Sequence, residues 1–302
     1  MTRCLLETGK HTITALTRAD SKSSLPSNVI AKQIDYDDHE SIVSALRGQD
    51  ALVITMSTFA PPGQQEKLIK AAADADVPWI LPNDWSPDTQ HEDLLRDVYP
   101  LFHVPEAKKK IEELGKSHWI GVTTGFWYEW SLAIPAAFGI DLRGREAMLF
   151  DDGTTKMTIS TWPQVGRAVA ALLSLPIEAA DGGSSERCLA HFRNKNIYVG
   201  SFTVSQKEML KSALRVTDTK LEDWKVSYEP AVERYETAKV DMKNGDRMAF
   251  ARQMYTRVFY PDDSGNFEKR VGLQNEMLGL PKEDMDEATR AAVKRQLESN
   301  WG

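Results

Sequence analysis

The sequence contains few cysteines and no long apolar run. Only Cys4 and Cys188 occur among the 302 residues, which is too few for a disulfide framework and fits a reducing compartment. No apolar run reaches the roughly 18 residues that cross a bilayer, and the N-terminus lacks the apolar segment of a signal peptide. We therefore predict a cytoplasmic location, with the nucleus as a second one, and no membrane partner.

Positive charge is also scarce. The 37 Lys and Arg residues are outnumbered by 44 Asp and Glu residues, and the net charge of -7 argues against direct binding of nucleic acid. The dense basic run KKK at 108–110 has Glu106 before it and Glu112 after it, so we interpret it as a solvated helix face. With 41% hydrophobic residues, the chain is long and apolar enough for one large core or two linked domains.

Several catalytic motifs are missing. The six His residues form no H-E-x-x-H and no pairing with Cys, so we predict no metal site. No G-x-S-x-G occurs, which argues against a hydrolase with a nucleophile elbow. G-x-G-x-x-G and G-x-x-G-x-x-G are absent as well, although such a loop normally binds the pyrophosphate of a dinucleotide. No other segment visibly replaces this loop.

Strand and helix patterns alternate through the first half of the sequence. Short β-branched or apolar runs predict buried strands at 11–17, 29–34, 51–56, 77–81 and 118–123. Apolar residues at helical spacing predict helices at 41–46, 67–75 and 105–115. This alternation is typical of an α/β fold with a doubly wound, Rossmann-like, mostly parallel sheet. The link 18–28 is short for a crossover helix.

A second region begins after Gly125. The aromatic-rich segment GFWYEWSLAIPAAFGIDL shows no regular pattern, and the rest of the chain is mostly helical and charged. We predict a nucleotide-binding domain at 1–150, to which 156–176 and 197–204 return. The segments 126–155 and 177–302 form a smaller, mainly helical substrate region. Ser205 and Glu208 have the spacing of a capping box that starts a helix at Gln206.

Polar residues gather where predicted strands end, and there they can contact a dinucleotide. In doubly wound folds the residue that ends the second strand meets the adenosine ribose, where Arg favours the 2′-phosphate of NADP and an acidic residue favours NAD. Arg18 is at such a strand end, so we predict NADP(H) in preference to NAD(H); an ordinary exposed arginine is the alternative. The residues predicted to bind cofactor from these strand ends are Thr17, Arg18, Ser21, Lys22, Asp35, Tyr36, Thr55, Met56 and Ser57.

Five segments together resemble a known family. LLETGKHTITALTR, DYDDHESIVSALRGQDALVIT, VPWILPNDWSPD, IEELGKSHWIGVTTGFWYEWSL and EMLGLP are similar to the fungal branch of the NmrA-like and isoflavone-reductase-like proteins, which are atypical short-chain dehydrogenase/reductases. The resemblance implies a Rossmann domain that binds NADP(H) and a C-terminal region that shapes a substrate cleft. Relatives begin with a strand and a glycine-rich loop ahead of a helix that ends like LLETGKH. We expect either a truncated start or a natural loss of that loop.

The resemblance also bears on individual site residues. It places Val104 at the position of the family's catalytic lysine, which leaves His103 and Lys108 as weak catalytic candidates, with surface positions as the alternative. It places Asn83 and Trp85 near the cofactor's nicotinamide, and Ser86 in the substrate pocket.

An aromatic group is the remaining candidate for substrate binding. Phe126, Trp127, Tyr128 and Trp130 could stack on a flat substrate, and core packing is the alternative. Tyr235 and Lys239 have the spacing of a short-chain dehydrogenase pair, but we interpret this match as coincidence because it lies far downstream.

Two functions remain open on the sequence. The first is an NADPH-dependent reductase of a small aromatic or carbonyl metabolite, whose partner is a small-molecule substrate. The second is a non-catalytic NADP(H) sensor that acts through a regulatory protein partner. An inactive, truncated family member is a third interpretation.

Overall fold

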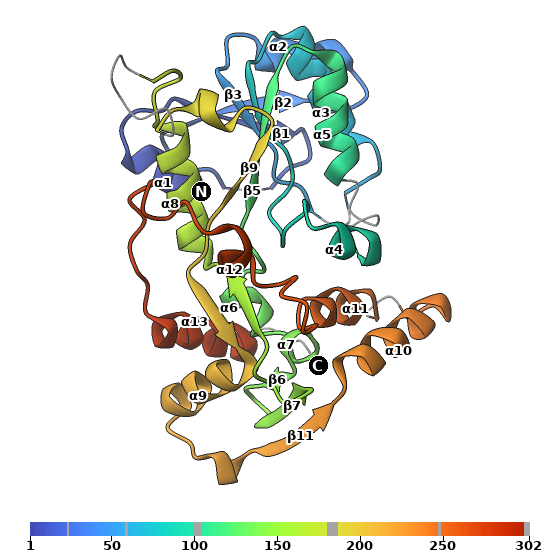
Figure 1. The fold of residues 1–302 in the computed structure, drawn as a ribbon. Coiled ribbons are helices and arrows are strands. Elements are labelled where there is room, and N and C mark those ends of the chain that lie inside the picture. The colour runs from blue at the N-terminus through green and yellow to red at the C-terminus, as the bar shows by residue number, and fades with distance from the viewer. Residues whose placement is uncertain (23, 58–59, 99–103, 180–186, 247–248, 299–302) are drawn as a thin grey trace.

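The fold has an upper α/β half and a lower half in which short strands are surrounded by helices (Figure 1). A computed structural model describes residues 1–22, 24–57, 60–98, 104–179, 187–246 and 249–298. None of the helices in these ranges is long and apolar enough to span a membrane.

Parallel strands form the upper half in two sheets. β1 (Ile13–Arg18) pairs with β2 (Val29–Ile34). The second sheet has the order β3-β4-β5-β9 and joins β3 (Ala51–Val53), β4 (Trp79–Leu81), β5 (His118–Thr123) and β9 (Lys195–Tyr198). The predicted Rossmann-like α/β fold is confirmed. The strands are divided between two sheets because, within the described ranges, no strand pairs with both β1 and β3.

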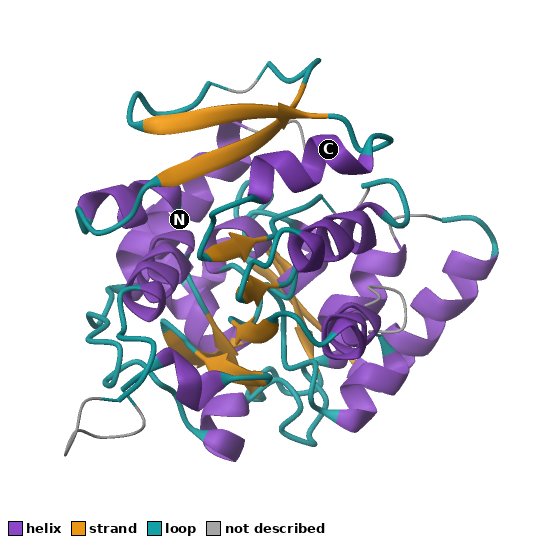
Figure 2. Cartoon of the chain, turned by 90° about the horizontal axis from the view of Figure 1, so that it is seen from above, coloured by secondary structure: helices purple, strands orange, loops and turns teal. Residues whose placement is uncertain are grey.

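Helices pack on both faces of the β3-β4-β5-β9 sheet, and Figure 2 shows helices around the strands in the middle of the molecule. Ile80 packs with residues of α2 (His39–Leu46), α3 (Gln64–Asp74) and α5 (Val104–Leu114). Its neighbours Trp79 and Leu81 pack instead with α8 (Trp162–Leu173), against which α1 (Thr2–Glu7) also lies. Successive side chains of a strand point to opposite faces, so a strand buried on both faces must be apolar throughout. This explains the continuous apolar runs at 77–81 and 118–123.

Helix starts follow local side-chain chemistry. The Asp38 carboxylate accepts the N–H groups of Glu40 and Ser41 at the start of α2, at 3.1 and 3.3 Å. The Thr161 hydroxyl does the same for Gln164 in α8, at 3.1 Å. The predicted capping box is confirmed at the start of α9 (Gln206–Thr217).

The lower half has its own core and two small sheets. One has the order β11-β7-β6, and in the other β8 pairs antiparallel with β10. Its strands are β6 (Ile140–Asp141), β7 (Glu146–Phe150), β8 (Lys156–Ile159), β10 (Phe202–Ser205) and β11 (Lys225–Glu229). Phe138, Phe150 and Phe259 pack edge to face at its centre, with ring centroids 6.0 and 5.2 Å apart.

Helical segments surround these strands. They are α4 (Glu92–Asp97), α6 (Tyr128–Ser131), α7 (Pro135–Phe138), η3 (Leu221–Asp223), α10 (Ala231–Lys243), α11 (Ala249–Arg257), α12 (Phe267–Val271) and α13 (Met285–Glu298). The short helix η2 (Leu189–Phe192) packs instead in the upper half, against β9. In the segments 156–176 and 197–204, α8 and the end of β9 pack in the upper half, whereas β8 and β10 pack in the lower core. The domain boundary at 150 stays a prediction.

Gly125 is the point where the chain leaves β5 for the lower half. Its φ angle is +65°, and a Cβ on it would lie 2.2 Å from the carbonyl oxygen of Thr158. Its N–H donates to the carbonyl of Ser86 at 3.2 Å. Glycine is the residue that adopts this backbone conformation freely and permits this approach of two backbones.

We expect Gly125→Ala to lower the free energy of unfolding by about 3 kcal/mol, because backbone strain adds to overpacking against a main-chain carbonyl. Gly115→Ala is the matched control, since Gly115 also has φ +65° but has no atom within 4 Å of the added Cβ. It should lose only about 1 kcal/mol. Urea denaturation of both variants measures the difference, and equal losses would contradict the role of the Thr158 carbonyl.

Candidate functional site

A cavity of about 350 Å³ lies at the carboxyl ends of β3 and β4. In doubly wound folds this edge of the sheet is where ligands bind. Thr55 and Met56 reach the cavity from the segment after β3, and Asn83 and Trp85 reach it from the segment after β4. Trp127 lines it from the start of α6. The other lining residues are Met1, Trp162, Val165 and Gly166.

Hydrogen bonds fix the two segments that follow β3 and β4. The Asn83 side chain accepts the N–H of Met56 at 3.0 Å and donates to its carbonyl at 3.3 Å. The Asn83 N–H donates to Gln65 Oε1 at 2.8 Å. Trp85 Nε1 donates to the carbonyl of Ile54 at 2.8 Å. The cavity wall is therefore tied to both strand ends and to α3.

The predicted adenosine-side residues lie outside the lining of this cavity. Arg18 ends β1 and forms an exposed ion pair with Asp20, 3.4 Å from Nε to Oδ1. Burial raises the pKa of Tyr36, and the nearby charge of Arg18 acts in the opposite direction. The pairing of β1 with β2 thus brings Arg18 and Tyr36 together.

Other predicted cofactor residues lie near these strand ends. The Asp35 carboxylate accepts the N–H of Asp37 at 2.9 Å. Thr17 is half-buried, and Ser21, Lys22 and Ser57 are exposed. Contact of any of these side chains with a cofactor stays a prediction.

Lys108 is buried, and its three ammonium donors are engaged. Its Nζ lies 2.5 Å from Asp84 Oδ2, 3.0 Å from Thr89 Oγ1 and 2.9 Å from Asn196 Oδ1. The interpretation of 108–110 as a solvated helix face is therefore wrong for Lys108, since its side chain is only 6% exposed. A buried lysine needs partners of this kind because an unpaired charge in the core is costly.

The catalytic candidates gain no support from their positions. Val104 is buried at the start of α5, and His103 lies outside the described residues. Lys108 is not among the residues that line the cavity. Burial raises the pKa of Asp84, while Lys108, Thr89 and Ser86 act in the opposite direction. The predicted catalytic role of Lys108 stays a prediction.

The predicted aromatic group divides between core and cavity. Phe126 packs on Tyr255, with ring centroids 4.1 Å apart, and Tyr128 is fully buried with its hydroxyl 2.8 Å from Thr289 Oγ1. Burial raises the pKa of Tyr128 far above its ordinary value. Core packing, the alternative interpretation, is what these two side chains do. Of this aromatic group, Trp127 lines the cavity, and the ring centroid of Trp130 lies 5.9 Å from that of Trp162.

Two further residues considered in the sequence analysis, Ser86 and Tyr235, make hydrogen bonds within the protein. Ser86 Oγ donates to Asp84 at 3.1 Å, and its carbonyl accepts the N–H groups of Thr124 and Gly125. Tyr235 is buried and donates to the carbonyl of Asp97 at 3.0 Å, and Lys239 Nζ lies 5.3 Å from the centroid of its ring.

Sequence reasoning missed Trp162, Val165 and Gly166, which α8 brings to the cavity. A Cβ on Gly166 would lie 2.9 Å from the backbone nitrogen of Met1, so glycine permits α1 to approach α8 closely. The helix-start pattern T-W-P before Gln164 was an available signal, because it places Trp162 at a helix N-terminus.

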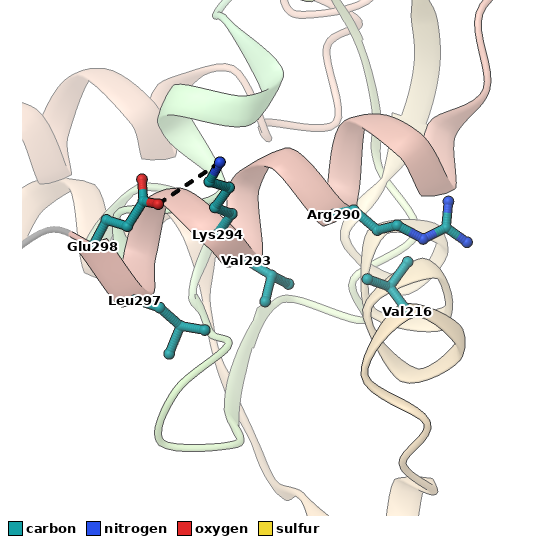
Figure 3. A pocket seen from close by; sticks show the side chains of 6 residues that line it. All are labelled: Val216, Arg290, Val293, Lys294, Leu297 and Glu298. Atoms are coloured by element: carbon teal, nitrogen blue, oxygen red, sulfur yellow. Dashed lines mark ion pairs between the residues drawn. The ribbon is translucent and has the colours of Figure 1, made fainter.

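A second hollow, of about 360 Å³, lies on the lower half between α9 and α13 (Figure 3). It is lined by Val216, Arg290, Val293, Lys294, Leu297 and Glu298, and Lys294 pairs with Glu298 at 3.8 Å. No residue predicted to bind cofactor or substrate lines it. The cavity at the strand ends is therefore the candidate site.

The family comparison covers the region that carries most of this cavity. Residues 1–138 match the profile of the NmrA-like family. This region belongs to the NmrA-like family. The match contains the strand pairs β1–β2 and β3–β4–β5 and the segments that follow β3 and β4. The resemblance noted in the sequence is confirmed.

The whole chain is similar to oxidoreductases in sequence and in fold. Oxidoreductase aprR of Aspergillus flavus is 25% identical over 292 residues, 94% of this chain and 91% of the relative. NADPH-dependent quinone oxidoreductase QOR2 of Escherichia coli, complexed with NADPH, has a TM-score of 0.65 at 17% identity, covering 95% of this chain and 93% of that one. AtPrR2 with NADP⁺ and (+)pinoresinol has a TM-score of 0.68 at 16% identity, covering 96% and 92%.

We expect Lys108→Met to lower the free energy of unfolding by about 3–5 kcal/mol, because it leaves Asp84 buried without its cation. Lys109→Met is the matched control: the Lys109 side chain is 78% exposed, so it should change stability by less than about 0.5 kcal/mol. Urea denaturation measures both. Equal losses would contradict the importance of the buried pair.

The Lys108→Met variant should also respond to pH. Losing its cation raises the folded-state pKa of Asp84 further above the unfolded value of about 4, so the folded state binds the proton more tightly. Its free energy of unfolding should therefore fall as the pH rises from about 4 to 7, and the double variant with Asp84→Asn should lose this dependence. A flat profile for the single variant would show that Asp84 is not the titrating group.

Proposed function

We propose that this protein is an NADPH-dependent reductase of a small aromatic or carbonyl-bearing metabolite. The observation that carries the proposal is the cavity. It unites Thr55 and Met56, expected at the cofactor from their place after a strand, with Asn83 and Trp85, which the family resemblance places near the nicotinamide. The similarity to aprR and the NADPH and NADP⁺ named for QOR2 and AtPrR2 support it.

The residues present fit the two ends of a dinucleotide. The cavity volume of about 350 Å³ falls within the usual range for ligand sites. Trp127 Nε1 is buried at this cavity without a hydrogen-bond partner in the described ranges, and a ligand acceptor would satisfy it. At the other end, Arg18 would hold a 2′-phosphate and the Tyr36 ring would lie against the adenosine.

Each group would have a defined task. Bound NADPH supplies a hydride. Asn83 and Trp85 hold the segment after β4 against that after β3 and so fix the shape of the cavity. Trp127 and Trp162 exclude water with flat apolar faces and orient a ligand. The chain contains no glycine-rich motif for the pyrophosphate, so the proposal rests on these two ends.

Arg18 should determine the preference for NADPH. We expect Arg18→Gln to raise the dissociation constant for NADPH by about tenfold or more and to leave that for NADH unchanged, because a charge-assisted hydrogen bond contributes about 1.5–3 kcal/mol. Arg47→Gln is the control, since Arg47 is equally exposed and pairs with Glu40. Calorimetric titration measures both nucleotides. Equal weakening of NADPH and NADH binding would contradict the predicted 2′-phosphate contact.

Measuring NADPH oxidation distinguishes the reductase hypothesis from the hypothesis of a non-catalytic NADP(H) sensor. We expect the purified protein to oxidise NADPH when aromatic ketones, enones and quinones are supplied, with loss of NADPH absorbance as the measurement. A Trp127→Ala variant should bind substrate more weakly and lower kcat/KM by about tenfold, because a lost stacking face weakens orientation. NADPH binding without turnover of any acceptor would overturn the reductase and favour a non-catalytic NADP(H)-binding regulator. Absence of NADPH binding would overturn both.

A further inference from the structure

Trp162 is a cavity-wall residue that is held from a distant part of the chain. It is the first residue of α8, and its side chain lines the cavity while the residue remains 38% exposed. The Arg295 guanidinium of α13 lies over its ring, 4.8 Å from the ring centroid. Arg295 also lies over Trp130, at 4.1 Å. One cation thus contacts two indole faces, and one of these indoles forms part of the cavity wall.

The backbone of Trp162 is fixed by a buried carboxylate. Glu129 Oε1 accepts the Trp162 N–H at 2.9 Å, and Glu129 is 7% exposed. Burial raises the pKa of Glu129, the neighbouring Glu283 adds to this rise, and the charge of Arg295 opposes it. Arg295 therefore serves both the ring of Trp162 and the carboxylate that holds its backbone.

The indole rings form a connected group around Trp162. Its ring centroid lies 6.1 Å from that of Trp127 at an angle of 59°, and 5.9 Å from that of Trp130 at 46°. Trp127 lines the same cavity. A movement of the Trp162 ring therefore changes both the wall of the cavity and the packing of these three indoles.

We propose that Arg295 is a positioning residue: it holds Trp162 in the wall of the cavity, so that the C-terminal helix α13 sets how tightly a ligand binds at the ends of β3 and β4. The identity of the ligand as NADPH rests on the proposed function. The positioning of the Trp162 ring by Arg295 does not depend on which ligand binds.

The test uses three variants of the full chain and two readouts. Arg295→Met removes the cation with little change in length, Arg295→Lys keeps a charge but loses the planar face, and Arg290→Met removes an exposed charge from the same helix. The first readout is circular dichroism of the ligand-free protein, because indoles at this spacing give an exciton couplet. The second is the NADPH dissociation constant from calorimetry.

For Arg295→Met we expect loss of the couplet and a three- to tenfold rise in the NADPH dissociation constant, in the range of a partly desolvated cation–π contact of about 0.5–1.5 kcal/mol. Arg295→Lys should lie between this variant and the wild type, and Arg290→Met should match the wild type. An unchanged couplet in Arg295→Met would overturn the inference. So would a lost couplet with unchanged NADPH affinity, which would leave the proposed function standing.

Two further outcomes are decisive. If Arg295→Met does not fold, Arg295→Lys decides, since it keeps a cation near Glu129, and a wild-type couplet in that variant would overturn the role of the planar guanidinium. If the wild type binds no NADPH, the proposed function fails. The circular dichroism of Arg295→Met then still tests whether Arg295 positions Trp162: loss of the couplet supports this role, and an unchanged couplet overturns it.

Discussion

The buried pair of Lys108 and Asp84 is the interaction on which the candidate site depends. Asp84 stands between Asn83 and Trp85, the two residues that the segment after β4 contributes to the cavity. Lys108 comes from α5 and also contacts Asn196 of β9. The pair therefore connects a helix, a neighbouring strand and the cavity wall. Its charges are desolvated and must stay paired, so the segment has one favourable position rather than several.

A second set of contacts joins the two halves of the molecule at the same place. The chain leaves β5 through Gly125, where the close backbone of Thr158 admits no side chain, and reaches Trp127 two residues later. α8 then returns to the upper half and presents Trp162 from its first turn. Since α13 contacts Trp162 through Arg295, a residue more than a hundred positions further along the chain supports the cavity wall.

Much of the upper half could be predicted from the sequence because its signals are local. The segments 29–34 and 118–123 were predicted as strands with the bounds that the structure has. β5 is buried along nearly its whole length, as predicted, but the prediction of a buried strand is wrong for β2, where Ile30 is 51% exposed. The polar residues after strands followed from the rule that ligands meet parallel sheets at their carboxyl ends. Thr55 and Met56 were found in this way, whereas Asn83 and Trp85 were predicted from the family resemblance.

Features that depend on distant partners could not be predicted. Nothing local distinguishes Lys108 from Lys109 and Lys110, since its burial depends on Asp84, 24 residues earlier. The aromatic segment at 126–130 was ambiguous for the same reason. The backbone is extended at Trp127, which forms a bridge with Ser160 before α6 begins, so Phe126 and Tyr128 enter the core while Trp127 lines the cavity. The separation of β1–β2 from the other sheet is likewise a property of strand pairing, which hydropathy does not encode.

The chemistry of the lining limits how a reductase could use this cavity. Its side chains, in the part of the chain that the structure describes, are apolar, aromatic, hydroxyl or amide, and none of them carries a proton that it releases near neutral pH. Lys108, the catalytic candidate in α5, donates its ammonium hydrogen bonds to Asp84, Thr89 and Asn196. Within the proposed function, these side chains would therefore shape the cavity and orient an acceptor, and the proton for the reduced product would come from a group other than these side chains.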